Sequence, residues 1–414
     1  MSQIGAWMQV FALGILVVEL AARDGTPERA PLYIGLVGLA RAIPGLALTP
    51  MAGAVADRTE RRRVLLVTQT TAALVAASLG ALIALEAIAL WHVLVAGMVA
   101  SAAFAFDAPA RHSMVANLVP RRTLPSAIGL QSAAFNAASI VGPLAAGLLY
   151  LPLGIAGLLF VNAAGFLAII GALVAMSPRP PVTVPTHSML RSVGEGLRYL
   201  RSNRATAWLL VLTASFVAVT GSFTALLPAI AGNSTAGGAS WLSLLLAATG
   251  IGALTGSFVI MRFGRSPRIG RVYVGASVAS GVGIVVFALS AQPLLALAAA
   301  YVTGLATTVT TGLTNNMLQV SVADEYRGRV MSLFVLQFIG ILPAGQLALG
   351  VLGTALGIHA ALVIGGVVAT AVGLYAALRV GVVRDWQGRP HTTPSPRPPQ
   401  GAPGSALVTR EPAR

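Results

Sequence analysis

Long apolar runs constrain the fold of this chain more than any other feature. Twelve segments hold almost no charge, and each reaches roughly the 20 residues that an α-helix needs to cross a bilayer. Backbone groups in lipid must bond within their own segment, so we expect every run to be helical. We predict an all-α membrane protein with twelve transmembrane helices, at residues 3–21, 32–56, 64–85, 88–106, 124–150, 155–176, 206–230, 238–261, 271–291, 294–318, 329–353 and 357–379.

Composition supports lipid as the main solvent. Only 9% of the 414 residues are charged, whereas soluble domains carry about 25%. The net charge is +15, and every basic side chain other than histidine is arginine. A nucleic-acid-binding protein can be equally basic, but these arginines form short clusters between apolar runs, so we expect no nucleic-acid partner. The chain has no cysteine, which excludes a disulfide framework and a thiolate metal site.

The arginines also orient the chain. They gather in the connections that follow even-numbered segments, whereas the first connection carries Arg23 and Arg29 beside Asp24 and Glu28. Positive charge near a span stays on the cytoplasmic side. We therefore expect both termini in the cytoplasm. The exclusive use of arginine is typical of a GC-rich bacterial genome, so we expect a multi-pass protein of the bacterial inner membrane. The arginines assigned to the cytoplasmic side are Arg58, Arg61, Arg62, Arg63, Arg111, Arg121, Arg122, Arg179, Arg191, Arg198, Arg201, Arg204, Arg262, Arg265, Arg268, Arg271, Arg327 and Arg329.

Four regions follow from this pattern. Residues 1–176 are predicted to form an N-terminal six-helix bundle, and 206–380 a C-terminal one. The connection 177–205 begins with proline-rich sequence and continues as an amphipathic helix. Residues 381–414 are expected to be a disordered cytoplasmic tail. At an offset of 203 residues, Gly142 aligns with Gly345 and Gly147 with Gly350, a weak repeat that indicates two pseudo-symmetric bundles.

The connection between the second and third segments carries a motif. It reads GAVADRTERRRVL from Gly53 to Leu65. This resembles the G-x-x-x-D-R-x-x-R-R/K loop of the major facilitator superfamily, with Glu60 in place of a usual glycine. The matching residues are Gly53, Asp57, Arg58, Arg61 and Arg62. The resemblance implies that Asp57 locks the cytoplasmic side by facing the start of the segment at 329–353, while Arg58 and its neighbouring arginines pair with acids such as Asp324 or Glu325.

Two further stretches extend this resemblance. The block Asp107-Ala-Pro-Ala-Arg111 is similar to the branch that includes siderophore and multidrug exporters, and we expect Pro109 to break the helix between the two charges. The fifth segment contains Gly142, Pro143 and Gly147, similar to the antiporter motif of the superfamily. That resemblance implies close packing against the other half and proton antiport.

Polar groups inside the spans are the candidates for a transport path. Arg41 lies near the membrane midplane, and Glu19 is the nearest acidic candidate in the sequence. Arg41 has two readings: it pins two helices through backbone carbonyls, or it contacts a substrate or a proton relay. The uncharged candidates for the path, which have helix-to-helix hydrogen bonding as their alternative use, are Gln131, Asn136, Asn315, Asn316, Gln319 and Gln337.

These features indicate a secondary transporter, with export of a hydrophobic or amphipathic small molecule against protons as the first hypothesis. Uptake by the same fold is one alternative, and a non-transporting receptor or scaffold is another. An enzyme is disfavoured because no phosphate-binding glycine loop, metal motif or nucleophile motif occurs. We expect no cofactor or metal, and a monomer surrounded by lipid.

Overall fold

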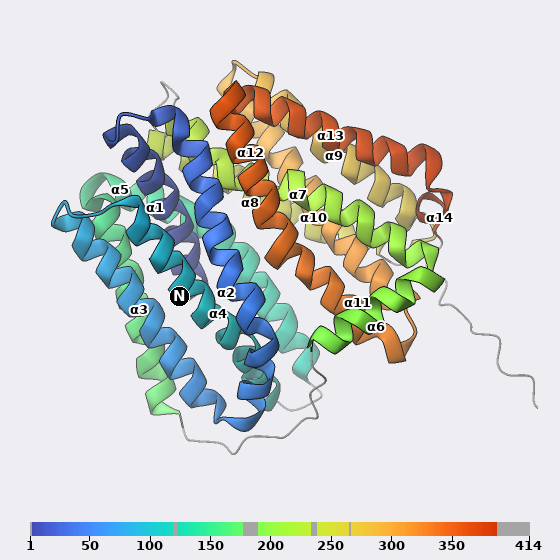
Figure 1. The fold of residues 1–414 in the computed structure, drawn as a ribbon, viewed down its shortest axis with the longest axis horizontal. Coiled ribbons are helices and arrows are strands. Elements are labelled where there is room, and N and C mark those ends of the chain that lie inside the picture. Colours follow the sequence, from blue (N-terminus) through green and yellow to red (C-terminus); the bar gives the residue numbers. More distant parts are fainter. Residues whose placement is uncertain (1, 119–122, 177–188, 233–237, 265, 387–414) are drawn as a thin grey trace, which may run out of the picture.

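The structure, a computed structural model, describes residues 2–118, 123–176, 189–232, 238–264 and 266–386 (Figure 1). Within these residues it contains helices and no strands, so the predicted all-α membrane class is confirmed. The elements are α1 (Ser2–Arg23), η1 (Pro27–Arg29), α2 (Ala30–Arg58), α3 (Arg61–Ala84), α4 (Leu90–Leu118), α5 (Leu124–Ala175), α6 (Met189–Ser202), α7 (Arg204–Gly232), α8 (Gly238–Phe263), α9 (Ile269–Leu289), α10 (Pro293–Ser321), α11 (Asp324–Leu336), η3 (Gln337–Ile341), α12 (Leu342–Leu356), α13 (Ile358–Arg379) and α14 (Gly381–Arg384).

Helix α5 contains two of the predicted spans. Among the described residues, 11 helical stretches are long and apolar enough to cross a membrane, and 137–175 counts as one of them. Gly154 interrupts its helical geometry with φ 62° and ψ −172°, a conformation that favours glycine. Before it, Tyr150 bonds to Glu19 of α1; after it, Asn162 bonds to Gln9. The chain therefore turns back along α1 at Gly154, and α5 supplies two antiparallel spans.

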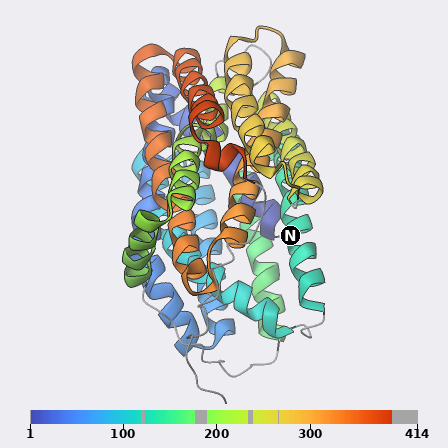
Figure 2. The same ribbon diagram turned by 90° about the vertical axis from the view of Figure 1, so that its right-hand side faces the viewer.

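The spans form two bundles, α1–α5 and α7–α13. In the first, α1 packs on α5, α2 on α4, and α3 on α5; in the second, α8 packs on α10 and α9 on α13. Viewed after a 90° turn, the helices run along one common direction (Figure 2). We call the end with the connections 59–60, 264–268 and 322–323 the basic end, because the arginines cluster there.

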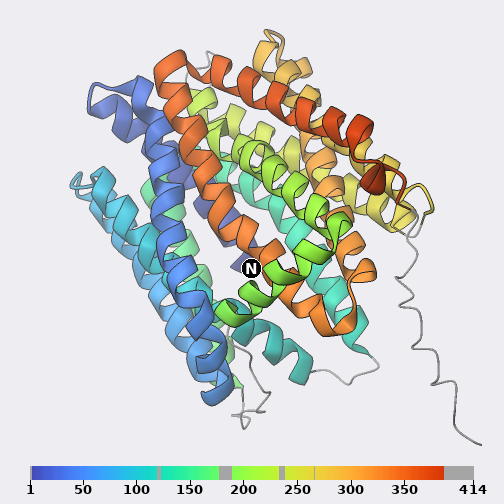
Figure 3. The ribbon, with the colours of Figure 1, turned by 45° about the vertical axis from the view of Figure 1, so that its right-hand side comes forward.

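The bundles meet at the end remote from the basic end. There α2 packs on α12 and α5 on α8, while α1 also contacts α7. Small residues make these contacts possible: a Cβ placed on Gly350 would lie 2.4 Å from the Pro31 carbonyl oxygen, and one on Gly147 would lie 2.5 Å from Ser243 Cβ. Toward the basic end the two bundles diverge (Figures 1 and 3).

Two details differ from the expectations. Pro109 lies inside α4, which continues to Leu118 instead of breaking there. Such prolines are tolerated in membrane helices because neighbouring groups bond the freed backbone carbonyl. Residues 381–386, expected in the tail, pack on α9 through buried Val383, whose carbonyl oxygen a Cβ on Gly270 would approach to 2.1 Å. The rest of the tail, 387–414, lies outside the described residues.

Charged residues form ion pairs in the linker helix and in this short C-terminal helix. Glu195 of α6 pairs with Arg329 of α11 at 2.6 Å, which holds the linker helix against the C-terminal bundle. Arg384 donates to both carboxylate oxygens of Asp385, and these hydrogen bonds hold the pKa of that carboxyl below its usual range.

The contact between α2 and α12 gives a testable prediction. In Gly350→Ala, the new methyl group meets the Pro31 carbonyl oxygen, so we expect the bundles to separate at the end remote from the basic end. Spin labels on Glu86→Cys and Gln292→Cys, at exposed turns of the two bundles, should then give a longer distance in nanodiscs. The chain has no other cysteine to label.

Gly171→Ala is the matched control, because a Cβ there meets nothing within 4 Å. An unchanged distance distribution in a folded Gly350→Ala protein would show that this contact does not hold the bundles together.

Candidate translocation site

Arg41 lies on the face of α2 that meets the other bundle. Its neighbours one turn away are Gly38 and Gly45. A Cβ on Gly38 would lie 2.2 Å from Oε1 of Gln346 in α12, and one on Gly45 would lie 3.3 Å from Cγ2 of Ile339 in η3. The Arg41 side chain, which is exposed, therefore emerges between helices of opposite bundles.

The opposite side of α2 is the one that faces lipid. Ile43 is 55% exposed, and two residues of helix place it about 160° from Arg41. The alkyl part of Arg41 lies over α4, where a Cβ on Gly97 would come within 3.1 Å of its Cγ. Ser101 Oγ donates to the Arg41 carbonyl oxygen at 2.6 Å. Helix α4 thus contacts Arg41 in two ways: Gly97 packs against its alkyl part, and the Ser101 hydroxyl bonds its backbone carbonyl.

The predicted partner of Arg41 is engaged elsewhere. The Glu19 carboxylate accepts a hydrogen bond of 3.0 Å from the Tyr150 hydroxyl, so it joins α1 to α5. Within the described residues, the Arg41 guanidinium forms no ion pair and no hydrogen bond. The reading in which Arg41 pins helices through carbonyls therefore has no support there. An arginine in the middle of a span costs about 2.5–3.5 kcal/mol on insertion scales unless it reaches water or a partner.

Asp107 is the other acid inside a span, and it is fully bonded. Arg111 donates to its Oδ2 from Nε at 2.9 Å and from Nη2 at 2.8 Å. Thr68 Oγ1 and Gln69 Nε2 of α3 donate to its Oδ1, at 3.0 and 2.6 Å. Because Pro109 does not break α4, the pair keeps i,i+4 spacing on one helix face. This buried carboxylate joins α3 to α4 near the basic end.

The arginines of the 53–65 motif are used within their own bundle. Arg62 donates to the carbonyl oxygens of Leu173 and Val174, at 2.6 and 2.8 Å, and so caps the C-terminus of α5. Arg63 pairs with Glu60 at 2.9 Å.

The remaining motif residues are less fully described. Arg61 begins α3. Gly53, Asp57 and Arg58 lie in the last turns of α2. The side chains of Asp57, Arg58 and Asp324 are outside the described residues.

The glycines of the α5 motif serve two different neighbours. A Cβ on Gly142 would lie 2.5 Å from Trp7 Cβ of α1, in the same bundle. Gly147 faces Ser243 of α8, across the interface between the bundles. Pro143 between them is buried. The motif therefore packs α5 on both sides.

The uncharged candidates do not form one cluster. Gln337 is buried and donates to the Leu210 carbonyl oxygen at 2.9 Å within the C-terminal bundle. Gln319 donates to Asn315 near the basic end of α10, and Asn316 lies beside Gly264. The side chains of the other two candidates, Gln131 and Asn136, are outside the described residues.

Two features of the site were not predicted from the sequence. Gln346 faces α2 from the other bundle, one turn from Arg41, but a single glutamine in an apolar run gave no signal. The π-helical turn η3 places Ile339 and Gly340 against Gly45 and Leu46. Such turns frequently occur at functional sites, and no residue pattern predicts them. No group of metal-binding side chains is found among the described residues.

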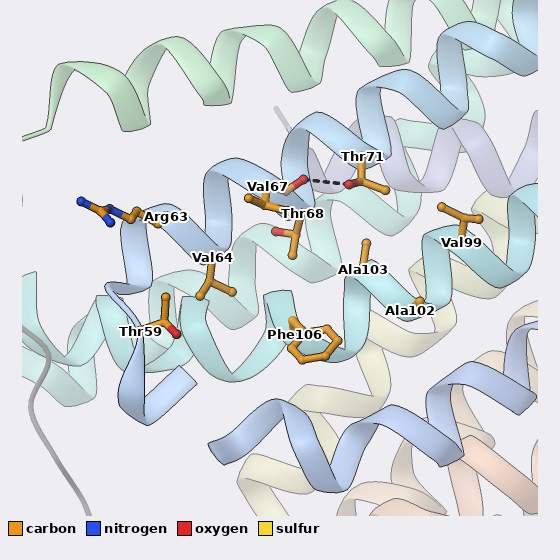
Figure 4. Close-up of a pocket in the computed structure, with 10 residues that line it drawn as sticks. All are labelled: Thr59, Arg63, Val64, Val67, Thr68, Thr71, Val99, Ala102, Ala103 and Phe106. Carbon is orange, nitrogen blue, oxygen red and sulfur yellow. Dashed lines mark hydrogen bonds between the residues drawn. The ribbon is translucent and has the colours of Figure 1, made fainter. Parts of the chain in front are cut away.

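A groove of about 460 Å³ lies apart from Arg41, between α3 and α4 (Figure 4). Its walls are mainly apolar, and the Thr68 and Thr71 hydroxyls are bonded to neighbouring groups, Asp107 and the Val67 carbonyl. It is lined by Thr59, Arg63, Val64, Val67, Thr68, Thr71, Val99, Ala102, Ala103 and Phe106. Val67 is 66% exposed and nearby Leu74 63%, so this face of α3 meets lipid, whose chains can fill the groove.

The Asp107 network gives a second prediction. Asp107→Asn leaves Arg111 without its charge partner and turns one hydrogen-bond acceptor into a donor. We expect a loss of about 1–3 kcal/mol of folding stability, measured as a lower melting temperature in detergent. Asp385→Asn, in an exposed pair, should change it little. Equal melting temperatures for all three proteins would contradict the structural role of Asp107.

The comparisons with known proteins agree with this architecture. Residues 1–397 match the model of a family described as transmembrane secretion effector. Macrolide efflux protein A of Enterococcus faecalis is 23% identical over 313 residues, which cover 73% of this chain and 94% of that protein. The enterobactin exporter EntS of Shigella boydii is 26% identical over 329 residues, 77% of each chain.

A solved structure shares the fold. A POT family transporter in complex with 5-aminolevulinic acid superposes with a TM-score of 0.69, over 93% of this chain and 94% of that one, at 13% identity. That likeness supports the fold alone. The family match over residues 1–397 and the two exporters establish that this multi-pass membrane protein belongs to the transmembrane secretion effector family of the major facilitator superfamily, and that it is a transporter rather than an enzyme.

Proposed function

We propose that this transporter exports an amphipathic small molecule from the bacterial cytoplasm by alternating access, driven by proton antiport. Its family is one of secretion effectors. Two relatives are named for efflux of a macrolide and export of enterobactin.

The divergence of the bundles toward the basic end is the observation that carries this proposal. Positive charge resists translocation, so the basic end lies in the cytoplasm. In this state the bundles touch at the outer end, through α2–α12 and α5–α8, and part at the inner end. A transporter in this state takes up its cargo from the cytoplasm.

The second state would bring the basic ends together. Asp57 lies in the last turn of α2, and α11 begins at Asp324. In the closed state the Asp57 carboxylate would face the positive N-terminal end of α11, with Arg58 near acids such as Glu325. Proton or substrate binding would release this lock. Arg62 stays with its own bundle, since it caps α5.

Uptake and a non-transporting role are the rival functions, and one experiment separates all three. Cells that lack their own drug exporters are loaded with macrolides, catecholate siderophores or dyes, with and without this protein. We expect lower accumulation with the protein, and loss of the difference on adding an uncoupler. Higher accumulation would identify uptake. No difference for any compound, in cells with the protein in the membrane, would reject transport of these classes.

The lock gives a third prediction. Asp57→Asn removes the charge that the N-terminus of α11 would stabilise, so transport should fall at least tenfold while the amount of protein in the membrane stays unchanged. Glu28→Gln, at an exposed position of η1, changes the charge equally and is the control. Export at the wild-type rate by Asp57→Asn would reject the lock.

A further inference from the structure

The spans contain a positive charge for which the described residues supply no negative partner. Of the 12 acidic residues in the sequence, Glu19 and Asp107 are the two that lie well inside spans. Glu19 accepts from Tyr150, and Asp107 is paired with Arg111. Ten residues of α4 separate Asp107 from Gly97, which lies beside Arg41, so Asp107 is about 15 Å further toward the basic end. The described residues therefore leave the charge of Arg41 unbalanced, and a group from outside the protein can balance it.

The position of Arg41 fits a ligand that enters between the bundles. The side chain is exposed, and it lies on the α2 face that meets α12 and η3 rather than on the lipid-facing side of Ile43. Its alkyl part lies on the bare backbone of Gly97, so this glycine leaves room for the arginine. From the other bundle, Gln346 places its amide against Gly38, one turn away. A ligand held there would touch both halves of the transporter.

The chemistry of arginine narrows the class of ligand. A guanidinium presents a planar set of donors that matches the two oxygens of a carboxylate and is always charged. Beside it, the path is apolar: Ile339 lies against Gly45, one turn from Arg41. The combination of one fixed cation and apolar walls suits a molecule with an apolar body and a single oxyanion.

We propose that Arg41 binds an oxyanion of the transported molecule, so that the substrates are amphipathic anions, carboxylates above all. Gln346 contributes a second polar contact from the other bundle. This inference rests on the proposed transport function and specifies its substrate class.

The test compares two probes that differ only in charge: dansyl-12-aminododecanoate and its primary amide. Binding to the full-length protein in nanodiscs is measured by energy transfer from tryptophan to the dansyl group, with empty nanodiscs subtracted. A charge-assisted hydrogen bond changes affinity about 10- to 100-fold. We expect the wild type to prefer the carboxylate by that factor, Arg41→Gln to bind both probes equally, and Arg41→Lys to keep part of the preference.

Arg379→Gln is the matched control, because it removes one exposed arginine at the end of α13, away from the path. It should bind as the wild type does. Arg41→Glu should reverse the selectivity, toward the dansyl derivative of 1,12-diaminododecane. Equal binding of both probes by the wild type, or an unchanged preference in Arg41→Gln, would overturn the assignment.

Failure of this inference is distinguishable from failure of the transport function. Wild-type cells that export compounds regardless of charge would retain the function and reject the role of Arg41. A charge preference in binding that depends on Arg41, without any export, would retain the role of Arg41 and reject export.

Discussion

The scarcity of hydrogen-bonding partners in lipid is the constraint on which this structure depends. Backbone groups in the hydrocarbon must be bonded internally, so each apolar run becomes a helix. A charged side chain must find a partner, and Asp107 finds four donor atoms, from Arg111, Thr68 and Gln69. Against this background Arg41 is an exception, because the described residues around it offer no acid. Because an unpaired charge in lipid is costly, the unpaired Arg41 indicates that this position binds a charged group during transport.

Lipid also determines how the two bundles adhere to each other. Lipid tails are as apolar as leucine, so helices associate through close packing rather than through hydrophobic burial. Gly35 and Gly350 bring α2 and α12 together, and Gly147 and Gly250 do the same for α5 and α8. Contacts of this kind hold little free energy individually. An interface built from them can part at one end and form at the other, as alternating access requires.

Much of the fold was predictable from the sequence, because span length and arginine placement follow directly from the membrane. The helical spans and the family both have local signals. The helix break at Pro109 was predicted wrongly, since lipid-embedded helices tolerate proline when neighbours bond the freed carbonyl. Packing of residues 381–386 on α9 was missed, because a short buried segment such as the one around Val383 carries no periodicity.

The site was harder to predict than the fold. Arg41 stands out in the sequence as a charge in an apolar run. Gly97, which contacts its alkyl part, and Gln346, which packs against Gly38 one turn away, belong to two other helices, so only the folded structure shows that they lie near it. Arg62 belongs to a motif that suggested a partner in the other half, and instead it caps α5. Long-range contacts of this kind leave no spacing pattern for a single sequence to reveal.

The most direct test of alternating access is to measure distances at both ends of the transporter in one set of conditions. One label pair, on Arg63→Cys and Gln319→Cys, reports the basic ends of the two bundles, and a second pair, on Glu86→Cys and Gln292→Cys, reports the other end. In lipid nanodiscs at several pH values, we expect two populations for each pair. The fraction with a short distance at the basic end should equal the fraction with a long distance at the other end. Ends that open and close together, or fractions that vary independently, would contradict two rigid bundles that expose one path to alternate sides.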